Sequence, residues 1–149
     1  MESIDSITAW AAGLFEGEGT VGIVNNRVTV TIQMTDKDIL DRMQKNFGGY
    51  LYECKRQQEH HKMSWKWVIS DSSGAIEFLN KIYPLLGERR RARVDEARGA
   101  FAGHRNEKMK RRIAEVKQLR EDGLTHQAIA DKLSLNRTYV SHILRGRYG

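Results

Sequence analysis

The sequence is poor in the features that mark secreted, membrane-spanning and zinc-binding proteins. Cys54 is the only cysteine among 149 residues, which excludes a disulfide framework and a zinc site built on cysteines. The chain has no run of about 18 apolar residues. Its start, Met1-Glu2-Ser3, lacks the basic and apolar segments of a secretory signal. We therefore expect an intracellular, cytoplasmic protein that has no membrane partner.

Positive charge is concentrated at one end of the chain. Residues 1–102 contain 14 basic and 14 acidic side chains, whereas residues 103–149 contain 11 basic and 5 acidic ones. The whole formal net charge of +6 therefore belongs to the last third of the chain. A basic segment beside a neutral body is typical of nucleic-acid binding, although charge alone fits a solvated basic tail equally well.

Apolar residues recur with helix and strand periods in a repeating order over residues 1–102. The expected order is a helix, a hairpin, a helix, a second hairpin and two further helices, which is an α+β plan. Asn25-Asn26 supplies a two-residue turn for the first hairpin. The expected ranges, in chain order, are 4–17, 20–24 with 27–34, 36–47, 50–57 with 62–70, 72–86 and 88–101.

Capping residues mark where the first two of these helices begin and end. Asp5 or Ser6 can cap the start of the first helix, and Thr35 can cap the second. Gly19 is expected to end the first helix in the left-handed conformation that glycine tolerates.

The strands alternate between apolar and polar residues, which predicts a sheet with one face buried under helices and one open polar face. Arg27 and Gln33 have side chains suited to guanine and adenine edges. An ordinary solvated face fits the alternation equally well. The outward polar positions are Arg27, Thr29, Thr31, Gln33, Lys62, Ser64 and Lys66.

Small residues and two acids share the first helix. Ala9, Gly13 and Gly17 are spaced by four and lie on one helix face, where another backbone can approach closely. Glu16 and Glu18 lie at the negative end of the helix dipole, and a divalent cation would stabilise them there. From spacing alone, an exposed acid pair beside a glycine cap is the simpler interpretation.

The string Ala11-Ala12-Gly13-Leu14-Phe15-Glu16-Gly17-Glu18-Gly19 resembles the nine-residue motif of the LAGLIDADG homing endonucleases. It agrees outright at Ala12, Gly13, Leu14 and Gly19. The order of elements over residues 1–102 is also similar to the core of that family, written αββαββα. The resemblance implies an open sheet face that lies in the major groove of double-stranded DNA, with no small-molecule substrate.

A chain with one such motif is implied to act as a homodimer, in which two motif helices pack through Ala9, Gly13 and Gly17. The resemblance implies that Glu18, with the carbonyl of Gly17, holds Mg²⁺ or another divalent cation such as Mn²⁺. Lys37 and Arg89 are the nearest matches to the basic residues that the family places near the cleaved phosphate. Arg89 stands where lysine is usual, and its proton is held too tightly for acid–base chemistry.

Residues 125–143 form a second motif, which resembles the helix-turn-helix of bacterial and phage regulators and recombinases. Ser134 departs from the glycine that is usual in its turn. Such a module places its last helix in the major groove, although a three-helix protein-interaction bundle is the alternative. Phosphate contacts are expected from Lys108, Lys110, Arg111, Arg112 and Arg147. The exposed positions of the last helix are Asn136, Arg137, Thr138, Tyr139, Ser141, His142 and Arg145.

We therefore expect an endonuclease domain over residues 1–102, a linker over 103–106 and a small all-α helix-turn-helix domain over 107–149. The expected function is site-specific, Mg²⁺-dependent double-strand cleavage of DNA by a homodimer. A non-cleaving DNA-binding regulator is the first alternative, and an RNA-splicing maturase is a weaker one.

Overall fold

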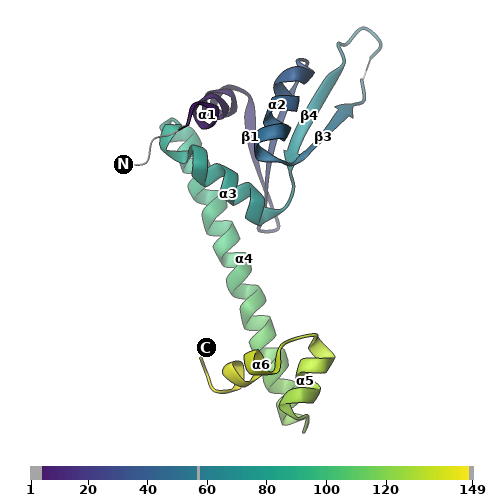
Figure 1. Ribbon diagram of the computed structural model, residues 1–149, viewed down its shortest axis with the longest axis vertical. Helices are drawn as coiled ribbons and strands as arrows, with labels where there is room; N and C mark the ends of the chain where they lie inside the picture. Colours follow the sequence, from purple (N-terminus) through teal and green to yellow (C-terminus); the bar gives the residue numbers. More distant parts are fainter. Residues whose placement is uncertain (1–4, 57, 148–149) are drawn as a thin grey trace. The chain divides into compact units, whose positions relative to one another are not determined.

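The computed structural model describes residues 5–56 and 58–147 (Figure 1). The order of elements that the sequence predicts for the first 102 residues is confirmed. Contacts between residues divide the chain into two units, one up to Ala102 and one from Gly103. The elements are α1 (Ser6–Glu18), β1 (Gly19–Val24), β2 (Arg27–Met34), α2 (Lys37–Phe47), β3 (Tyr50–Cys54), β4 (Ser64–Ile69), α3 (Ser72–Ile82), the 3-10 turn η1 (Tyr83–Leu85), α4 (Glu88–Glu121), α5 (His126–Leu133) and α6 (Arg137–Leu144).

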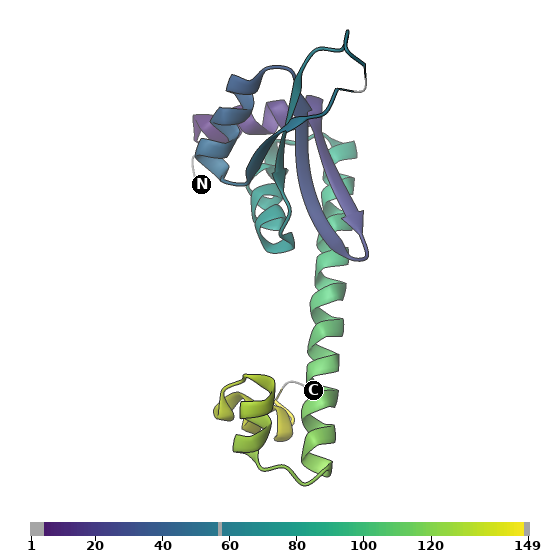
Figure 2. The same cartoon turned by 90° about the vertical axis from the view of Figure 1, so that its right-hand side faces the viewer.

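The first unit contains a four-stranded antiparallel sheet with the strand order β1-β2-β4-β3. The hairpin that joins β1 to β2 is seen in Figure 2. Asn25 and Asn26 both have positive φ angles, 51° and 61°, which gives the tight two-residue turn that matches the twist of the flanking strands. The predicted turn is confirmed, and it fixes the register of the two strands.

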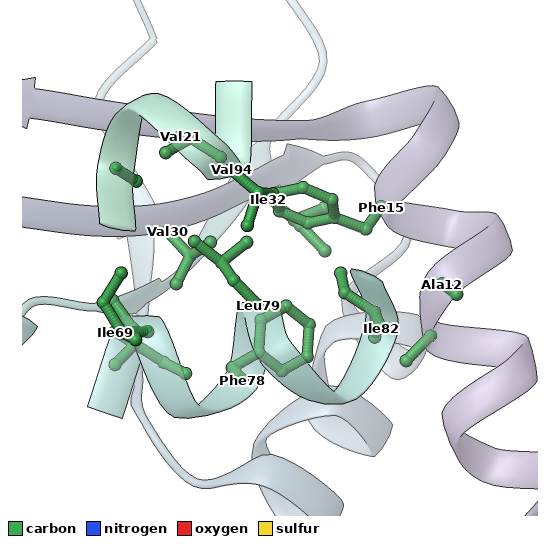
Figure 3. Close-up of a cluster of buried hydrophobic side chains, with 14 of the residues drawn as sticks. Ala12, Phe15, Val21, Val30, Ile32, Ile69, Phe78, Leu79, Ile82 and Val94 are labelled. Atoms are coloured by element: carbon green, nitrogen blue, oxygen red, sulfur yellow. The ribbon is translucent and has the colours of Figure 1, made fainter. Parts of the chain in front are cut away.

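One hydrophobic core lies between the sheet and the helices of the first unit (Figure 3). Phe78 of α3 lies near its centre, where its ring makes edge contacts with the rings of Phe15, Phe47 and Trp67. Val94 of α4 is also fully buried in this core. The inward positions that the alternation of β2 predicts, Val28, Val30 and Ile32, have no exposed surface.

The first helix ends differently from the prediction. Gly19 is not left-handed, because its φ of −79° and ψ of 153° are extended, and β1 begins directly at this residue. Glycine is needed there for space: a Cβ atom on Gly19 would collide with the ring of Phe15, which is fully buried. The ring of Phe15 thus lies under the junction between α1 and β1.

The caps of the helices agree only in part with the prediction. Asp5 caps α1, since its carboxylate accepts from the amide nitrogen of Thr8 at 2.7 Å, and this hydrogen bond lowers the pKa of Asp5. The prediction of Thr35 as the cap of α2 is wrong. The helix begins at Lys37, which puts Asp36 in the cap position, and Asp36 makes no capping hydrogen bond through its side chain.

The helix expected to end at Phe101 continues without a break to Glu121 as α4. The segment 103–106, expected as a linker between two helices, is therefore helical. Gly103 is the only strong helix breaker in that segment, and one glycine inside a helix costs only about 1 kcal/mol relative to alanine. No proline accompanies it, so nothing in the segment forces the helix to stop.

The second unit has a small core of its own, to which the end of α4, α5 and α6 contribute. Val116, Ile129, Ala130, Val140 and Ile143 are buried in it. Thr125 caps α5, because its hydroxyl accepts from the amide nitrogen of Ala128 at 3.1 Å. The second unit thus has a buried apolar core of its own and a side-chain cap at the start of α5.

Ser134, between α5 and α6, has a φ of 53° and a ψ of 46°, a left-handed conformation that is strained for serine. We expect Ser134→Gly to stabilise the second unit by about 1 kcal/mol. Amide hydrogen exchange of α5 and α6 would then slow about fivefold. Ser134→Ala is the matched control and should give no gain. Equal protection of the α5 and α6 amides from exchange in the glycine and alanine variants would show that the backbone of Ser134 is not strained.

Candidate functional site

The outer face of α1 is smooth and exposed. Ala9, Gly13 and Gly17 are all exposed, whereas Ala11 and Phe15 on the inner face are buried. A Cβ atom added to Gly13 or Gly17 would have no atom within 4 Å, apart from its own helix backbone and chain neighbours. The positions of this stripe therefore do not pack against other described residues.

The two acids of α1 have different surroundings. The carboxylate of Glu16 accepts from the amide nitrogen of Gly87 at 3.2 Å, which ties the end of α1 to the start of α4. The carboxylate of Glu18 is exposed, and no described residue donates a hydrogen bond to it or forms an ion pair with it. Glu16 thus has a structural partner, whereas Glu18 is available to a ligand.

Two arginines near the start of α4, Arg90 and Arg91, donate to backbone carbonyl groups. Arg90 donates through Nε to the carbonyl oxygen of Glu16 at 3.2 Å and through Nη1 to that of Gly19. The guanidinium thereby compensates the negative end of the α1 dipole beneath Glu18. Arg91 donates to the carbonyl oxygens of Tyr83 and Pro84 instead. Sequence alone could not reveal these roles, because the carbonyl partners of Arg90 lie about 70 residues away.

The two basic residues expected near a cleaved phosphate differ in their contacts. Lys37 lies in the first turn of α2, and its Nζ is bound to the carboxylate of Asp41 at 2.9 Å. Arg89 lies in the first turn of α4 and is exposed, with no hydrogen bond or ion pair to a described residue. Arg89 is therefore the more available of the two cations.

The open face of the sheet begins beside Glu18. Gly19 pairs with Ile32, so Gln33 is the next β2 residue toward the end of α1. Arg27 lies six residues earlier on the same strand, about 20 Å away. The side chains of this face, in the order β1, β2, β4, β3, are Thr20, Val24, Arg27, Thr29, Thr31, Gln33, Ser64, Lys66, Val68, Tyr50, Tyr52 and Cys54.

None of the strand side chains on this open face is a carboxylate, and two of them, Arg27 and Lys66, are cationic. Lys62 lies outside β4, in the segment that precedes it. The amide of Gln33 donates to the hydroxyl of Ser64 at 3.2 Å, which fixes two of the predicted polar residues together. The face therefore suits a polyanionic partner that presents hydrogen-bonding groups.

Sequence reasoning missed the two tyrosines of β3. Tyr50 and Tyr52 are 69% and 49% exposed, among the most exposed large hydrophobic side chains of the chain. Their signal was present in the alternation with Leu51, which packs against the core. Exposed rings belong to the outer face in the same way as the polar residues that alternate with the core positions.

The donors at the end of α1 fit a divalent cation. The carboxylate of Glu18 and the last carbonyl groups of the helix, including that of Gly17, are hard oxygen donors at the negative end of a dipole. Within the described residues, however, no three acidic, histidine or cysteine side chains come together as a metal-binding group. A complete set of ligands would require donors beyond these described residues.

The residues predicted for the last helix fall into two groups. Arg137, Thr138 and Arg145 are exposed, and their side chains make no hydrogen bond with a described residue. The side chains of the others have contacts within the unit. Asn136 caps α6 by accepting from the amide nitrogen of Thr138 at 2.7 Å, and Ser141 hydrogen-bonds His126 at 2.9 Å. The hydroxyl of Tyr139 lies 3.5 Å from the sulfur of Met109, and His142 lies 3.5 Å from Arg147.

None of the helices in the described part of the chain is long and apolar enough to cross a membrane.

The basic side chains expected to meet phosphates lie mostly in solvent. On α4, Lys108, Lys110 and Arg111 are exposed, and Arg112 is half-buried. Arg147 is exposed beyond α6.

No protein-family model and no curated protein sequence matches the chain. Among solved structures, the group I intron-encoded homing endonuclease I-CeuI complexed with DNA is similar, with a TM-score of 0.55 and 12% identity over 76% of this chain. The match spans 62% of that chain, less than two thirds of its length. This likeness supports the αββαββα plan of the first unit.

Two further DNA complexes are similar at lower TM-scores. The homing endonuclease I-CvuI in complex with its target has a TM-score of 0.48 and 20% identity, covering 93% of this chain and 92% of that chain. The archaeal intron-encoded homing endonuclease I-Vdi141I complexed with DNA has a TM-score of 0.45 and 17% identity, covering 95% and 97%.

Proposed function

We propose that the chain is a site-specific, Mg²⁺-dependent double-strand DNA endonuclease that acts as a homodimer. One observation carries the proposal. The carboxylate of Glu18 has no partner among the described residues, and it lies between a smooth exposed helix stripe and an open sheet face without carboxylates. The fold similarity to a homing endonuclease in complex with DNA supports it.

The stripe of Ala9, Gly13 and Gly17 packs against the same stripe of a second copy. Twofold packing of this kind brings the two Glu18 carboxylates together at the ends of two α1 helices. This adds a second Glu18 carboxylate to a site where the described residues of one chain form no metal-binding group of three. Mg²⁺ or Mn²⁺ bound there supplies Lewis-acid stabilisation of the attacking and leaving oxygens.

Other residues of the chain position the reacting groups. Arg90 holds the carbonyl groups at the junction of α1 and β1, and thereby fixes the direction of Glu18. Arg89 offers a guanidinium to the charge that develops on the phosphate. Lys37 has a weaker case, since its amine is already bound to Asp41.

The open sheet face of each protomer lies in the major groove of one half-site. Gln33, Lys66 and Ser64 contact bases near the cleavage centre, and Arg27 contacts the outer part of the half-site about 20 Å away. Thr29, Thr31 and Lys62 complete the polar contacts. The absence of carboxylates from the strands of this face favours contact with the phosphate-lined groove.

The second unit is a helix-turn-helix module that extends the recognised site. Its α6 enters a major groove with Arg137, Thr138 and Arg145, which are exposed. The module is stabilised by the internal contacts of Asn136, Tyr139, Ser141 and His142. These residues contact DNA only through atoms that those contacts leave available. The two domains are residues 1–102 and 107–149, and a helical connection over 103–106 joins them.

Neutralising the basic stretch of α4 should weaken DNA binding and reduce its salt dependence. We expect the quadruple variant Lys108→Gln, Lys110→Gln, Arg111→Gln and Arg112→Gln to lower the slope of log K against log salt by about 3 to 4 per protomer. Filter binding at several salt concentrations measures this slope. The double variant Lys45→Gln and Lys81→Gln, on helices that cover the other sheet face, is the control and should change it little. Equal slopes for the two variants would count against the placement of phosphate contacts on α4.

The cleavage itself is tested on a diverse plasmid library, with Mg²⁺ and then with EDTA. Discrete linear fragments that form only with Mg²⁺ support the endonuclease. A non-cleaving regulator on the same fold is the second candidate, and the engagement of Lys37 by Asp41 favours it. A regulator would retard the same DNA in a gel without cutting it.

A further inference from the structure

The rings on the open face of the sheet are concentrated on its β4–β3 side. The β1–β2 side carries hydroxyl, amide and guanidinium groups, represented by Thr31, Gln33 and Arg27, and one exposed aliphatic side chain, Val24. The β4–β3 side adds the rings of Tyr50 and Tyr52 and the side chain of Val68 to the polar groups of Ser64 and Lys66. A partner that covers the whole face therefore meets aromatic surface at the β3 edge beside polar groups.

Neither tyrosine ring belongs to the hydrophobic core that the described residues form, although Tyr50 borders a hollow that Asp71 and Glu77 also line. Leu51, which lies between them in β3, packs against the core, whereas Tyr50 and Tyr52 are 69% and 49% exposed. Their hydroxyls bond no described residue. Tyr83 provides a contrast, because it is half-buried, donates to Asp95 at 3.2 Å and lies under the guanidinium of Arg98.

The surroundings of these rings favour DNA over a protein partner. Tyr52 pairs with Lys66, which in turn pairs with Gln33, so one line of side chains connects the ring to the polar half. This line starts beside Glu18. No carboxylate interrupts it, and the tyrosines therefore continue a cationic and hydrogen-bonding surface rather than form an isolated apolar patch.

In the major groove, the apolar group that a base pair offers is the C5 methyl group of thymine. On the basis of the proposed function, we propose that Tyr50 and Tyr52 select thymine in each half-site by ring contact with this methyl group. The phenol hydroxyls remain free to bind water or phosphate, so the ring and not the hydroxyl carries the selectivity. Gln33 and Arg27 select bases through hydrogen bonds, and the tyrosines add an apolar criterion.

Uracil tests the proposal, because it pairs like thymine and lacks only the methyl group. The full-length protein selects duplexes from a random library amplified with dTTP, and each thymine of the enriched half-site is then replaced by uracil. Affinity should fall about fourfold for each methyl group contacted. Tyr52→Phe should keep this loss, since it retains the ring. The double variant Tyr50→Ala and Tyr52→Ala should bind thymine and uracil duplexes equally.

Leu85→Ala is the matched control, because Leu85 is an exposed apolar side chain (41%) on η1, outside the sheet. It should leave the discrimination between thymine and uracil unchanged. Enriched duplexes that bind equally well with uracil, or a double alanine variant that still discriminates, would overturn this inference alone. Failure to enrich any duplex would overturn the proposed function as well.

Discussion

Gly13→Leu is expected to convert the homodimer into a monomer and to abolish double-strand cleavage. A leucine at this position meets the partner helix twice, once from each protomer, and steric overlap of this kind should weaken dimerisation by roughly 10²-fold or more. The monomer itself should fold normally, because a side chain at Gly13 would meet open space and leucine favours helix over glycine. Sedimentation velocity at micromolar protein, with and without DNA, measures the change.

Gly99→Leu is the matched control for this prediction. Gly99 is also an exposed helical glycine with no atom within 4 Å of an added Cβ, but it lies on α4 outside the proposed interface. This variant should sediment and cut as the unchanged protein does. A stable dimer of the Gly13→Leu variant would show that the α1 stripe is not the interface.

Glu18→Gln is expected to lower the cleavage rate by about 10³-fold or more, because it removes the charged oxygen donor of each protomer. The affinity for DNA without metal should stay within a few-fold, since Glu18 makes no hydrogen bond or ion pair with a described residue. Cleavage of a single defined duplex under saturating protein measures the rate, and gel retardation in EDTA measures the affinity.

Glu16→Gln separates a metal ligand from a structural acid. The glutamine oxygen can still accept from the amide nitrogen of Gly87, so this variant should retain most of its activity. The opposite ranking, with Glu16 essential and Glu18 dispensable, would move the catalytic centre away from the position proposed for it.

Much of the first unit could be predicted from the sequence, because its patterns are local. The alternation of β2 separates Val30 and Ile32 from Thr31 and Gln33, and burial confirms the separation. The turn at Asn25 and Asn26 follows from residues that tolerate positive φ. Strand length and turn chemistry suffice for such features, since both depend on neighbours in the chain.

The features that were missed depend on residues distant in sequence. Gly19 is glycine because of the Phe15 ring and not because of its own φ angle. Arg90 binds carbonyl groups of α1 and β1 that lie more than 70 residues away in the sequence. The linker expected over 103–106 is helical for another reason: helix propensity over the flanking residues outweighs the one glycine, Gly103.

In the candidate site, too, local features could be predicted from the sequence, and contacts between distant residues could not. The exposure of Glu18 and of the glycine stripe agrees with what the motif implies. The different roles of Glu16 and Glu18, and the exposed rings of Tyr50 and Tyr52, became visible only with the packing of α4 and the register of β3.

The central claim is that two symmetry-related Glu18 residues cut the two strands of one DNA site. The most direct measurement maps the cleaved bond on each strand of a duplex that the protein has selected for binding, with Mg²⁺ and with EDTA. The proposal predicts one cut in each strand, at positions related by a twofold axis at the centre of the site, both only with Mg²⁺. A duplex that is bound tightly and stays intact with Mg²⁺, or that is cut in one strand only, would contradict it.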